Sequence, residues 1–215
     1  MKTKNKRNFC FAAGLLAAFV LWTGAVCLVD VQGIGPQGSA VGLASVNHWF
    51  HEFTGVHMAL YTLTDWLSLV PLGFVAGFGL LGLVQWIGRK GLRKVDFSIL
   101  VLGGFYLAVL AGFLLFELVP VNYRPVLIDG VLEVSYPSST TLLVMCVIPT
   151  AMLQFGARIK NRVFRCCVIL LLAAFLVFMV LGRLLSGVHW LTDIIGGGLL
   201  SAGLVTLYAA VCALE

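Results

Sequence analysis

Three side chains that could act together on a phosphate group lie near the C-terminus. Arg183, His189 and Asp193 fall within the segment GRLLSGVHWLTDIIGGG, residues 182–198. His189 and Asp193 are four residues apart, so on a helix they would share one face, with Cβ atoms about 6 Å apart. A carboxylate at that distance can accept the imidazole N–H and leave the other ring nitrogen free as a nucleophile or base. Arg183 carries the planar guanidinium that suits phosphate oxygens, so the segment indicates phosphoryl chemistry.

On spacing alone, charges at helix ends together with a hydrogen-bonded histidine at the membrane surface explain the segment equally well. A second polar stretch bears on this choice. It contains Arg124-Pro125 and ends in Tyr136-Pro137-Ser138-Ser139-Thr140-Thr141. Hydroxyl residues after a proline and before an apolar run are typical of a helix start. Because a helix N-terminus presents free N–H groups and the positive end of a dipole, this stretch predicts an anion site.

The rest of the chain has the composition of a membrane protein. It has 215 residues, of which 60% are hydrophobic and 11% charged, and its mean hydropathy is +1.04. Soluble domains contain about 25% charged residues, so the chain is expected to lie in the bilayer. A helix of about 20 apolar residues crosses the hydrocarbon core, and the first apolar run is too long for a signal peptide. The sequence predicts one all-α, polytopic membrane domain over 1–215, a bundle of six transmembrane helices at 9–29, 66–88, 97–116, 140–156, 166–182 and 190–213.

The basic residues are distributed unevenly between the ends of these spans. Of the 14 Lys and Arg residues, 12 form three clusters of four, in residues 2–7, 89–94 and 158–165. With six spans, all three clusters fall on one side, which the positive-inside rule makes the cytoplasm, with both termini inside. This placement argues against nucleic acid as a partner. Arg124 and Arg183 are the exceptions on the outer side, and we therefore interpret them as functional.

Residues 30–64 form a less apolar stretch before the second span. It contains VNHWFHEFTGVHMALY, whose mixture of aromatic and polar residues predicts an amphipathic helix at the outer membrane interface. The spacing of His48, His51 and His57 is not that of an HxxxH or HExxH pair. Interfacial histidines are therefore favoured over a zinc site, and no metal ligands are predicted.

With these segments in place, the sequence resembles the type 2 phosphatidic acid phosphatases, relatives of the vanadium haloperoxidases. The third motif of that family is Ser-Arg, five residues, His, three residues, Asp, and residues 182–193 match it except that Gly182 replaces the serine. Arg124-Pro125 matches the end of the first motif, which is Lys, six residues, Arg-Pro. Pro137-Ser138 matches the start of the second, Pro-Ser-Gly-His. Order, spacing and the six-span topology agree from about residue 65 onward.

The resemblance implies a lipid phosphatase that works at the outer membrane face without a metal or other cofactor. His189 would attack phosphorus and form a phosphohistidine, with Asp193 orienting the ring. The phosphate oxygens would be held by Arg124, Arg183, Ser138 and backbone amides near Ser139. Candidate substrates are polyprenyl diphosphates or phosphates such as undecaprenyl diphosphate, phosphatidic acid and phosphatidylglycerol phosphate, and the oligomeric state is left open.

Two positions depart from the family's motifs. Glu117 stands in place of the lysine, which reverses the charge near an anion site, and Thr140 stands in place of the second histidine, after Ser139 in place of glycine. In the family that histidine protonates the leaving group, which is typically worth ~10²–10⁴-fold in rate. Threonine cannot supply a proton at neutral pH. The chain is then catalytically impaired, or its leaving group needs little help, or another acid serves, or position 140 is altered in an otherwise active protein.

Two functions from different classes are consistent with these residues. The first is an outer-face lipid phosphatase, for which a diphosphate is the easier substrate because phosphate leaves more readily than an alkoxide. The second is a binder or transporter of lipid phosphates without turnover, which Glu117 and Thr140 favour. The intact set of Arg183, His189 and Asp193 argues against a mere binder. A haloperoxidase is less favoured because the related haloperoxidases are soluble and this chain is embedded in the membrane. A channel is less favoured because the predicted spans contain few polar residues.

Overall fold

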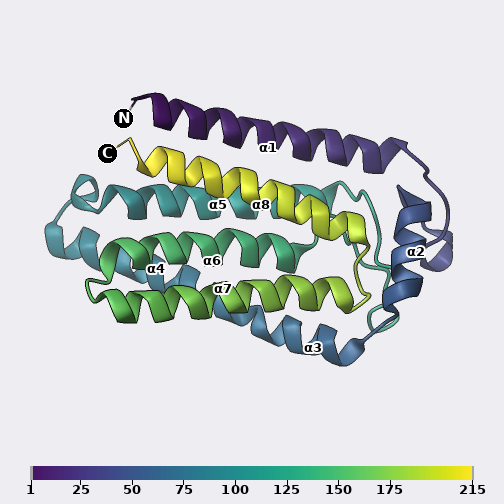
Figure 1. Ribbon diagram of the computed structural model, residues 1–215. Coiled ribbons are helices and arrows are strands. Elements are labelled where there is room, and N and C mark those ends of the chain that lie inside the picture. Colours follow the sequence, from purple (N-terminus) through teal and green to yellow (C-terminus); the bar gives the residue numbers. More distant parts are fainter. Residues whose placement is uncertain (1, 215) are drawn as a thin grey trace.

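The computed structural model describes the backbone of residues 2–214 and the side chains of residues 5–214. Met1, Glu215 and the side chains of Lys2 and Lys4 in the first basic cluster lie outside the described residues. Figure 1 shows the long helices side by side as a bundle, with the shorter α2 across one end. In chain order the helices are α1 (Lys2–Leu28), α2 (Ala44–Thr54), α3 (Met58–Leu67), α4 (Leu69–Arg89), α5 (Phe97–Leu118), α6 (Ser139–Arg158), α7 (Arg162–Leu185) and α8 (Leu191–Cys212), with short 3₁₀ turns η1 (Pro36–Gly38) and η2 (Leu92–Lys94).

Six helical stretches in the described part of the chain are long and apolar enough to cross a membrane. They are Asn5–Leu28, Met58–Arg89, Phe97–Leu118, Ser139–Arg158, Arg162–Leu185 and Leu191–Cys212. This confirms the predicted all-α, six-span membrane fold. Five of the stretches begin and end within a few residues of the predicted bounds.

The second span is the exception, because its helix begins earlier than predicted. The sequence predicts an interfacial helix that extends to residue 61, but Gly55 has φ +67 and ends α2 at Thr54. Glycine adopts this left-handed conformation without the steric cost that other residues meet. The chain then starts a new helix at Met58, and α3 and α4 together form the second membrane-spanning stretch. The interfacial helix is therefore the shorter α2, whose exposed Trp49 and Phe53 rings stack 6.2 Å apart.

The two ends of the bundle differ in what they carry. Both termini and the α4–α5 and α6–α7 connections lie at one end, here called the terminal end (Figure 1). The predicted basic clusters belong to this end, where Asp96 pairs with Arg89 and Arg158 at 2.8 Å each. Hydrogen bonds from the two arginines and Gln85 lower the pKa of Asp96 to about 2. The opposite end, here called the site end, is formed by α2, residues 119–138 and residues 186–190.

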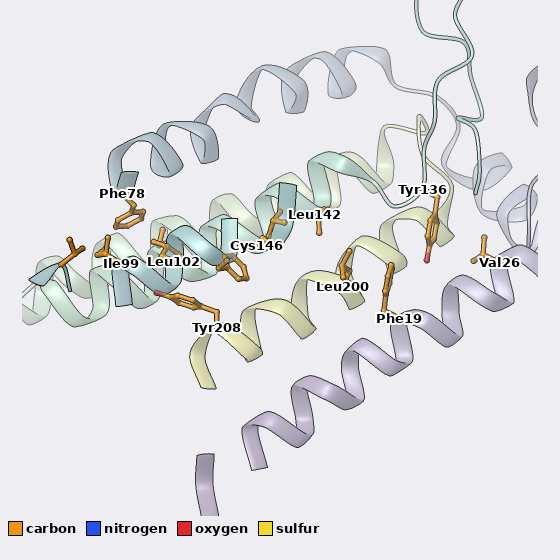
Figure 2. Close-up of a cluster of buried hydrophobic side chains, with 14 residues drawn as sticks. Phe19, Val26, Phe78, Ile99, Leu102, Tyr136, Leu142, Cys146, Leu200 and Tyr208 are labelled. Carbon is orange, nitrogen blue, oxygen red and sulfur yellow. The ribbon is translucent and has the colours of Figure 1, made fainter. Parts of the chain in front are cut away.

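Glycines of α8 let its neighbours come unusually close. A Cβ at Gly196 would lie 2.6 Å from the Tyr136 ring, and one at Gly203 would lie 2.7 Å from Leu16 of α1. The tight packing of this helix is therefore made with other parts of the same chain. Figure 2 shows the resulting core, in which Phe19, Tyr136 and Leu200 lie together near the site end. The Tyr136 hydroxyl also lies 2.7 Å from Thr23 Oγ1, which fixes the chain just before α6.

Candidate active site

Arg124 is positioned by the segment between α5 and α6, which folds back on itself. Antiparallel bridges pair Tyr123 with Val134 and Ile128 with Val131. The backbone N–H of Arg124 donates to the carbonyl of Glu133 at 2.9 Å. The Arg124 side chain is 9% exposed and lies against the bundle, so the hairpin carries this guanidinium inward.

Ser138 caps α6, as the sequence predicts. Its Oγ accepts hydrogen bonds from the Thr141 backbone N–H at 3.4 Å and the Thr141 hydroxyl at 3.0 Å. The Ser138 N–H donates in turn to the carbonyl of Asp193 at 3.1 Å. The start of α6 is therefore joined to the first turn of α8, which brings the second and third motif segments together.

His189 lies in the turn between α7 and α8, not on a helix. Its side chain is almost completely buried, and its Nδ1 is 3.7 Å from Asp193 Oδ2, longer than an ordinary hydrogen bond. Neither ring nitrogen has a hydrogen-bond partner among the described residues. Burial lowers the pKa of His189 to about 4, with Asp193 opposing this shift and Arg124 and Arg183 adding to it. The imidazole is therefore neutral at pH 7 and has the lone pair that a nucleophile needs.

Asp193 is held by several donors rather than by the histidine alone. It lies in the first turn of α8, where its Oδ2 accepts the Trp190 N–H at 2.9 Å and its Oδ1 accepts from Asn122 Nδ2 at 3.1 Å. Thr192 accepts further hydrogen bonds from Asn47 and Asn122. The expectation that His189 and Asp193 share a helical face is thus replaced by a capped turn, in which the carboxylate faces the Nδ1 side of the ring.

The two arginines meet over the ring of Tyr61, which belongs to α3. The guanidinium carbons of Arg183 and Arg124 lie 4.8 Å and 5.7 Å from the ring centroid. The two positively charged guanidinium groups repel each other, and the attraction of each to the Tyr61 ring face offsets part of that repulsion. Each arginine also has a carboxylate partner: Arg124 Nε lies 2.9 Å from Glu133, and Arg183 Nη2 lies 3.6 Å from Asp65.

The turn after α7 is docked tightly against the α2–α3 junction. A Cβ at Gly187, which has φ +69, would lie 2.0 Å from the Gly55 carbonyl oxygen. The backbone N–H of His57 donates to the Ser186 carbonyl at 2.9 Å. Only a glycine permits this approach, which explains why residue 187 is a glycine.

A cavity of about 980 Å³ begins at the arginines and runs down the bundle between α4, α5 and α6. Arg124, Arg183, Ser139 and Thr140 line its site end. Its remaining wall is mostly apolar and extends along α4 from Leu72 to Trp86, about 20 Å at 1.5 Å per residue. Such a space fits a hydrocarbon chain attached to a polar head.

The two positions that depart from the family motifs lie differently with respect to this cavity. Thr140 is buried and lines it directly. Glu117 is exposed at the end of α5 and borders a separate, much smaller pocket with Ser135 and Tyr136. The expected charge reversal therefore does not fall on the cavity wall that carries the arginines. In the described part of the chain, no group of three or more His, Cys, Asp or Glu residues could hold a metal ion.

A sequence model of the PAP2 superfamily matches residues 120–213. These residues belong to the PAP2 superfamily. The matched region contains every residue that the motifs predicted for the site, from Arg124 to Asp193. None of the curated proteins compared with the chain matches it.

The fold as a whole is similar to that of a transmembrane PAP2 protein. The crystal structure of the first transmembrane PAP2 type phosphatidylglycerolphosphate phosphatase from Bacillus subtilis matches with a TM-score of 0.58. The match covers 93% of each chain at 18% sequence identity, so the likeness concerns the fold. The chain is accordingly a multi-pass membrane protein with the fold of a membrane phosphatase.

Sequence reasoning missed the contribution of α3, which lies outside the PAP2 region. Tyr61, Thr64 and Asp65 all contact Arg183, although at least 118 residues separate them in the chain. Their i, i+3, i+4 spacing at the start of an apolar run is a signal that could have placed them on one helical face. Asn47 and Asn122, buried and hydrogen-bonded to the start of α8, gave no comparable signal.

Proposed function

We propose that this PAP2 protein is an integral membrane lipid phosphatase that forms a phosphohistidine on His189. The observation that carries the proposal is a group of buried nitrogens without partners among the described residues. They are both ring nitrogens of His189, Nη1 of Arg124 and Nε of Arg183. Buried donors without acceptors are costly and uncommon in native structures. A phosphate group beside His189 would accept hydrogen bonds from both guanidinium groups and offer phosphorus to the imidazole.

The first chemical step follows from the arrangement around His189. Asp193 faces Nδ1, so Nε2 is the nitrogen left to attack phosphorus. As the bond from Nε2 to phosphorus forms, the bond from phosphorus to the leaving oxygen breaks, and its electron pair departs with that oxygen. Asp193 then stabilises the positive charge that develops on the ring. Arg124, Arg183, the Ser138 hydroxyl and amides near Ser139 hold the remaining oxygens.

Thr140 limits which leaving group the site can release. A threonine beside the phosphate has no proton to give at neutral pH, so an alkoxide would have to leave without help. A phosphate departs from a diphosphate without that help. We therefore propose a polyprenyl diphosphate as the preferred substrate, with its chain in the apolar cavity. The positive-inside rule places the site on the outer face, opposite the basic clusters of the terminal end.

The experiment that tests this function measures phosphate release in detergent with a chelator present. The substrates are a polyprenyl diphosphate and phosphatidic acid, and the proteins are the native chain, His189→Ala and Thr140→His. We expect the native chain to hydrolyse the diphosphate faster than phosphatidic acid, and His189→Ala to be inactive on both. Thr140→His should mainly raise the rate on phosphatidic acid, by up to about 10²-fold.

Two outcomes would change the assignment. If the native chain prefers phosphatidic acid, the substrate proposal is wrong. If only Thr140→His turns over, the native protein binds lipid phosphates without hydrolysing them. The pairing of each arginine with a carboxylate, Glu133 or Asp65, is the observation that favours this second function.

A further inference from the structure

The second step of a phosphohistidine mechanism, hydrolysis of the phosphoenzyme, requires a general base. The inference made here rests on the function proposed above. Water must attack the phosphohistidine and lose a proton as it does so. General-base help in such a step is typically worth ~10²–10⁴-fold. Thr140 cannot take that proton at neutral pH, so another side chain at the cavity has to accept it.

Asp65 has the location that this role demands. It lines the cavity together with Arg124, Arg183 and Thr140. Its carboxylate lies 3.6 Å from Arg183 Nη2, and 55% of its side chain is exposed. Arg183 thus has one nitrogen, Nε, without a partner among the described residues, and another, Nη2, that faces Asp65. A phosphate bound at Nε would therefore have the Asp65 carboxylate beside the same guanidinium.

The position of Asp65 is fixed by the docking of α3 on the end of α7. The Tyr61 ring lies 4.8 Å from the Arg183 guanidinium, and Thr64 Oγ1 lies 3.4 Å from Arg183 Nη1. The Thr64 methyl occupies the space beside Gly182, 2.7 Å from where a Cβ would be. These three contacts, all made by one face of α3, fix the Asp65 carboxylate beside Arg183.

The other carboxylates near the site end have different surroundings. Asp193 is fully buried and accepts hydrogen bonds from Trp190 and Asn122. Glu133 is bound closely to Arg124 Nε, at 2.9 Å, and does not line the cavity. Glu117 borders the separate small pocket. Of the acidic side chains that the structure describes, Asp65 is the one on the cavity wall.

We propose that Asp65 is the general base that hydrolyses the phosphohistidine. An Asp65 carboxylate oxygen takes a proton from water as the water oxygen bonds to phosphorus. The bond between phosphorus and His189 Nε2 breaks, and its electron pair returns to the ring. Phosphate leaves, and Asp65 then releases its proton to solvent. Because Asp65 is a carboxylate paired with Arg183, it serves this step and does not protonate the leaving group of the first.

The test follows the phosphoenzyme directly, by rapid quenching with farnesyl diphosphate radiolabelled in its terminal phosphate. Asp65→Asn should retain the first burst of farnesyl phosphate release and accumulate label on His189, approaching one phosphate per chain. Its steady-state rate should fall by ~10²-fold or more. Added formate, a small carboxylate, should restore turnover to Asp65→Ala. Asp129→Asn, in the hairpin and away from the site, should behave as the native chain.

A matched variant and a folding control keep the outcomes distinct. Glu133→Gln removes the carboxylate from the other arginine and should not accumulate labelled protein. If Asp65→Asn loses burst and turnover together, or keeps the native rate, Asp65 is not the base. If Asp65→Asn does not fold, the test becomes the restoration of turnover in Asp65→Ala by formate. If folded Asp65→Ala does not regain turnover with formate, the proposal is overturned. If the native chain and all variants release no phosphate and carry no label, it is the phosphatase function itself that fails.

Discussion

Among single residues, we expect His189 to set the pH range in which the candidate site can work. Its nitrogens are buried and have no hydrogen-bond partner among the described residues, and its Asp193 neighbour is 3.7 Å away rather than at hydrogen-bond distance. Burial therefore dominates, and the ring stays neutral without a strong partner. A neutral ring can attack phosphorus, whereas a protonated ring cannot.

We expect the His189 ring to stay neutral until the pH falls to about 4, well below the ordinary pKa of 6.5. Phosphoenzyme formation should then be lost as the pH falls through about 4, not through 6.5. Between these values the unfolded chain binds more protons than the folded one, so folding stability should also decline as the pH falls. Nitrogen NMR of labelled histidines, assigned by difference with His189→Gln, measures the titration. A midpoint near 6.5 would contradict the role of burial.

Among the helices, α3 and the end of α7 are fitted to each other. The family motif that this chain resembles has a serine where Gly182 stands, and the Thr64 methyl fills the space that its Cβ would take. Introducing a side chain into such a contact typically costs about 1–3 kcal/mol.

Gly182→Ser should therefore lower the melting temperature in detergent and disturb Arg183. Replacing Thr64 by serine removes the methyl group and keeps the hydroxyl that faces Arg183 Nη1. The double variant Gly182→Ser/Thr64→Ser should accordingly recover much of the loss, a coupling that a double-mutant cycle measures. Two independent, additive losses would show that the helices do not meet there as described.

The same two helices show what the sequence could and could not predict. Membrane spans and the third motif are local patterns, so their positions followed from hydropathy and spacing. The meeting of Tyr61 with Arg183 depends on how distant helices pack, which no local pattern records. The early start of the second span was missed because one glycine conformation, at Gly55, divides an otherwise continuous amphipathic stretch. The four-residue spacing of His189 and Asp193 suits a shared helical face and a capped turn equally well, so spacing alone could not decide between them.

For the whole molecule, the distribution of charge predicts an orientation. Arg93 lies in the basic turn at the terminal end, and Val131 is exposed in the hairpin at the site end. In a chain without its native cysteines, Val131→Cys should react with an impermeant maleimide added to intact cells. Arg93→Cys should react only after the membrane is opened. The reverse pattern would place the candidate active site in the cytoplasm.

The wall of the long cavity contains Gly79, Gly82 and Gly103, so part of that wall is bare helix backbone. A Cβ at Gly103 would meet no atom within 4 Å, and the same holds for Gly112, which also lies on α5 but does not line the cavity. Gly103→Leu should therefore reduce kcat/KM for a long polyprenyl diphosphate relative to farnesyl diphosphate by about tenfold or more, whereas Gly112→Leu should leave that ratio unchanged. An equal response of the two variants would show that this surface does not set chain-length preference. If only Gly103→Leu lowers the ratio, discrimination among lipids is set by side chains that the protein lacks, and a single codon change shifts its preference toward shorter chains.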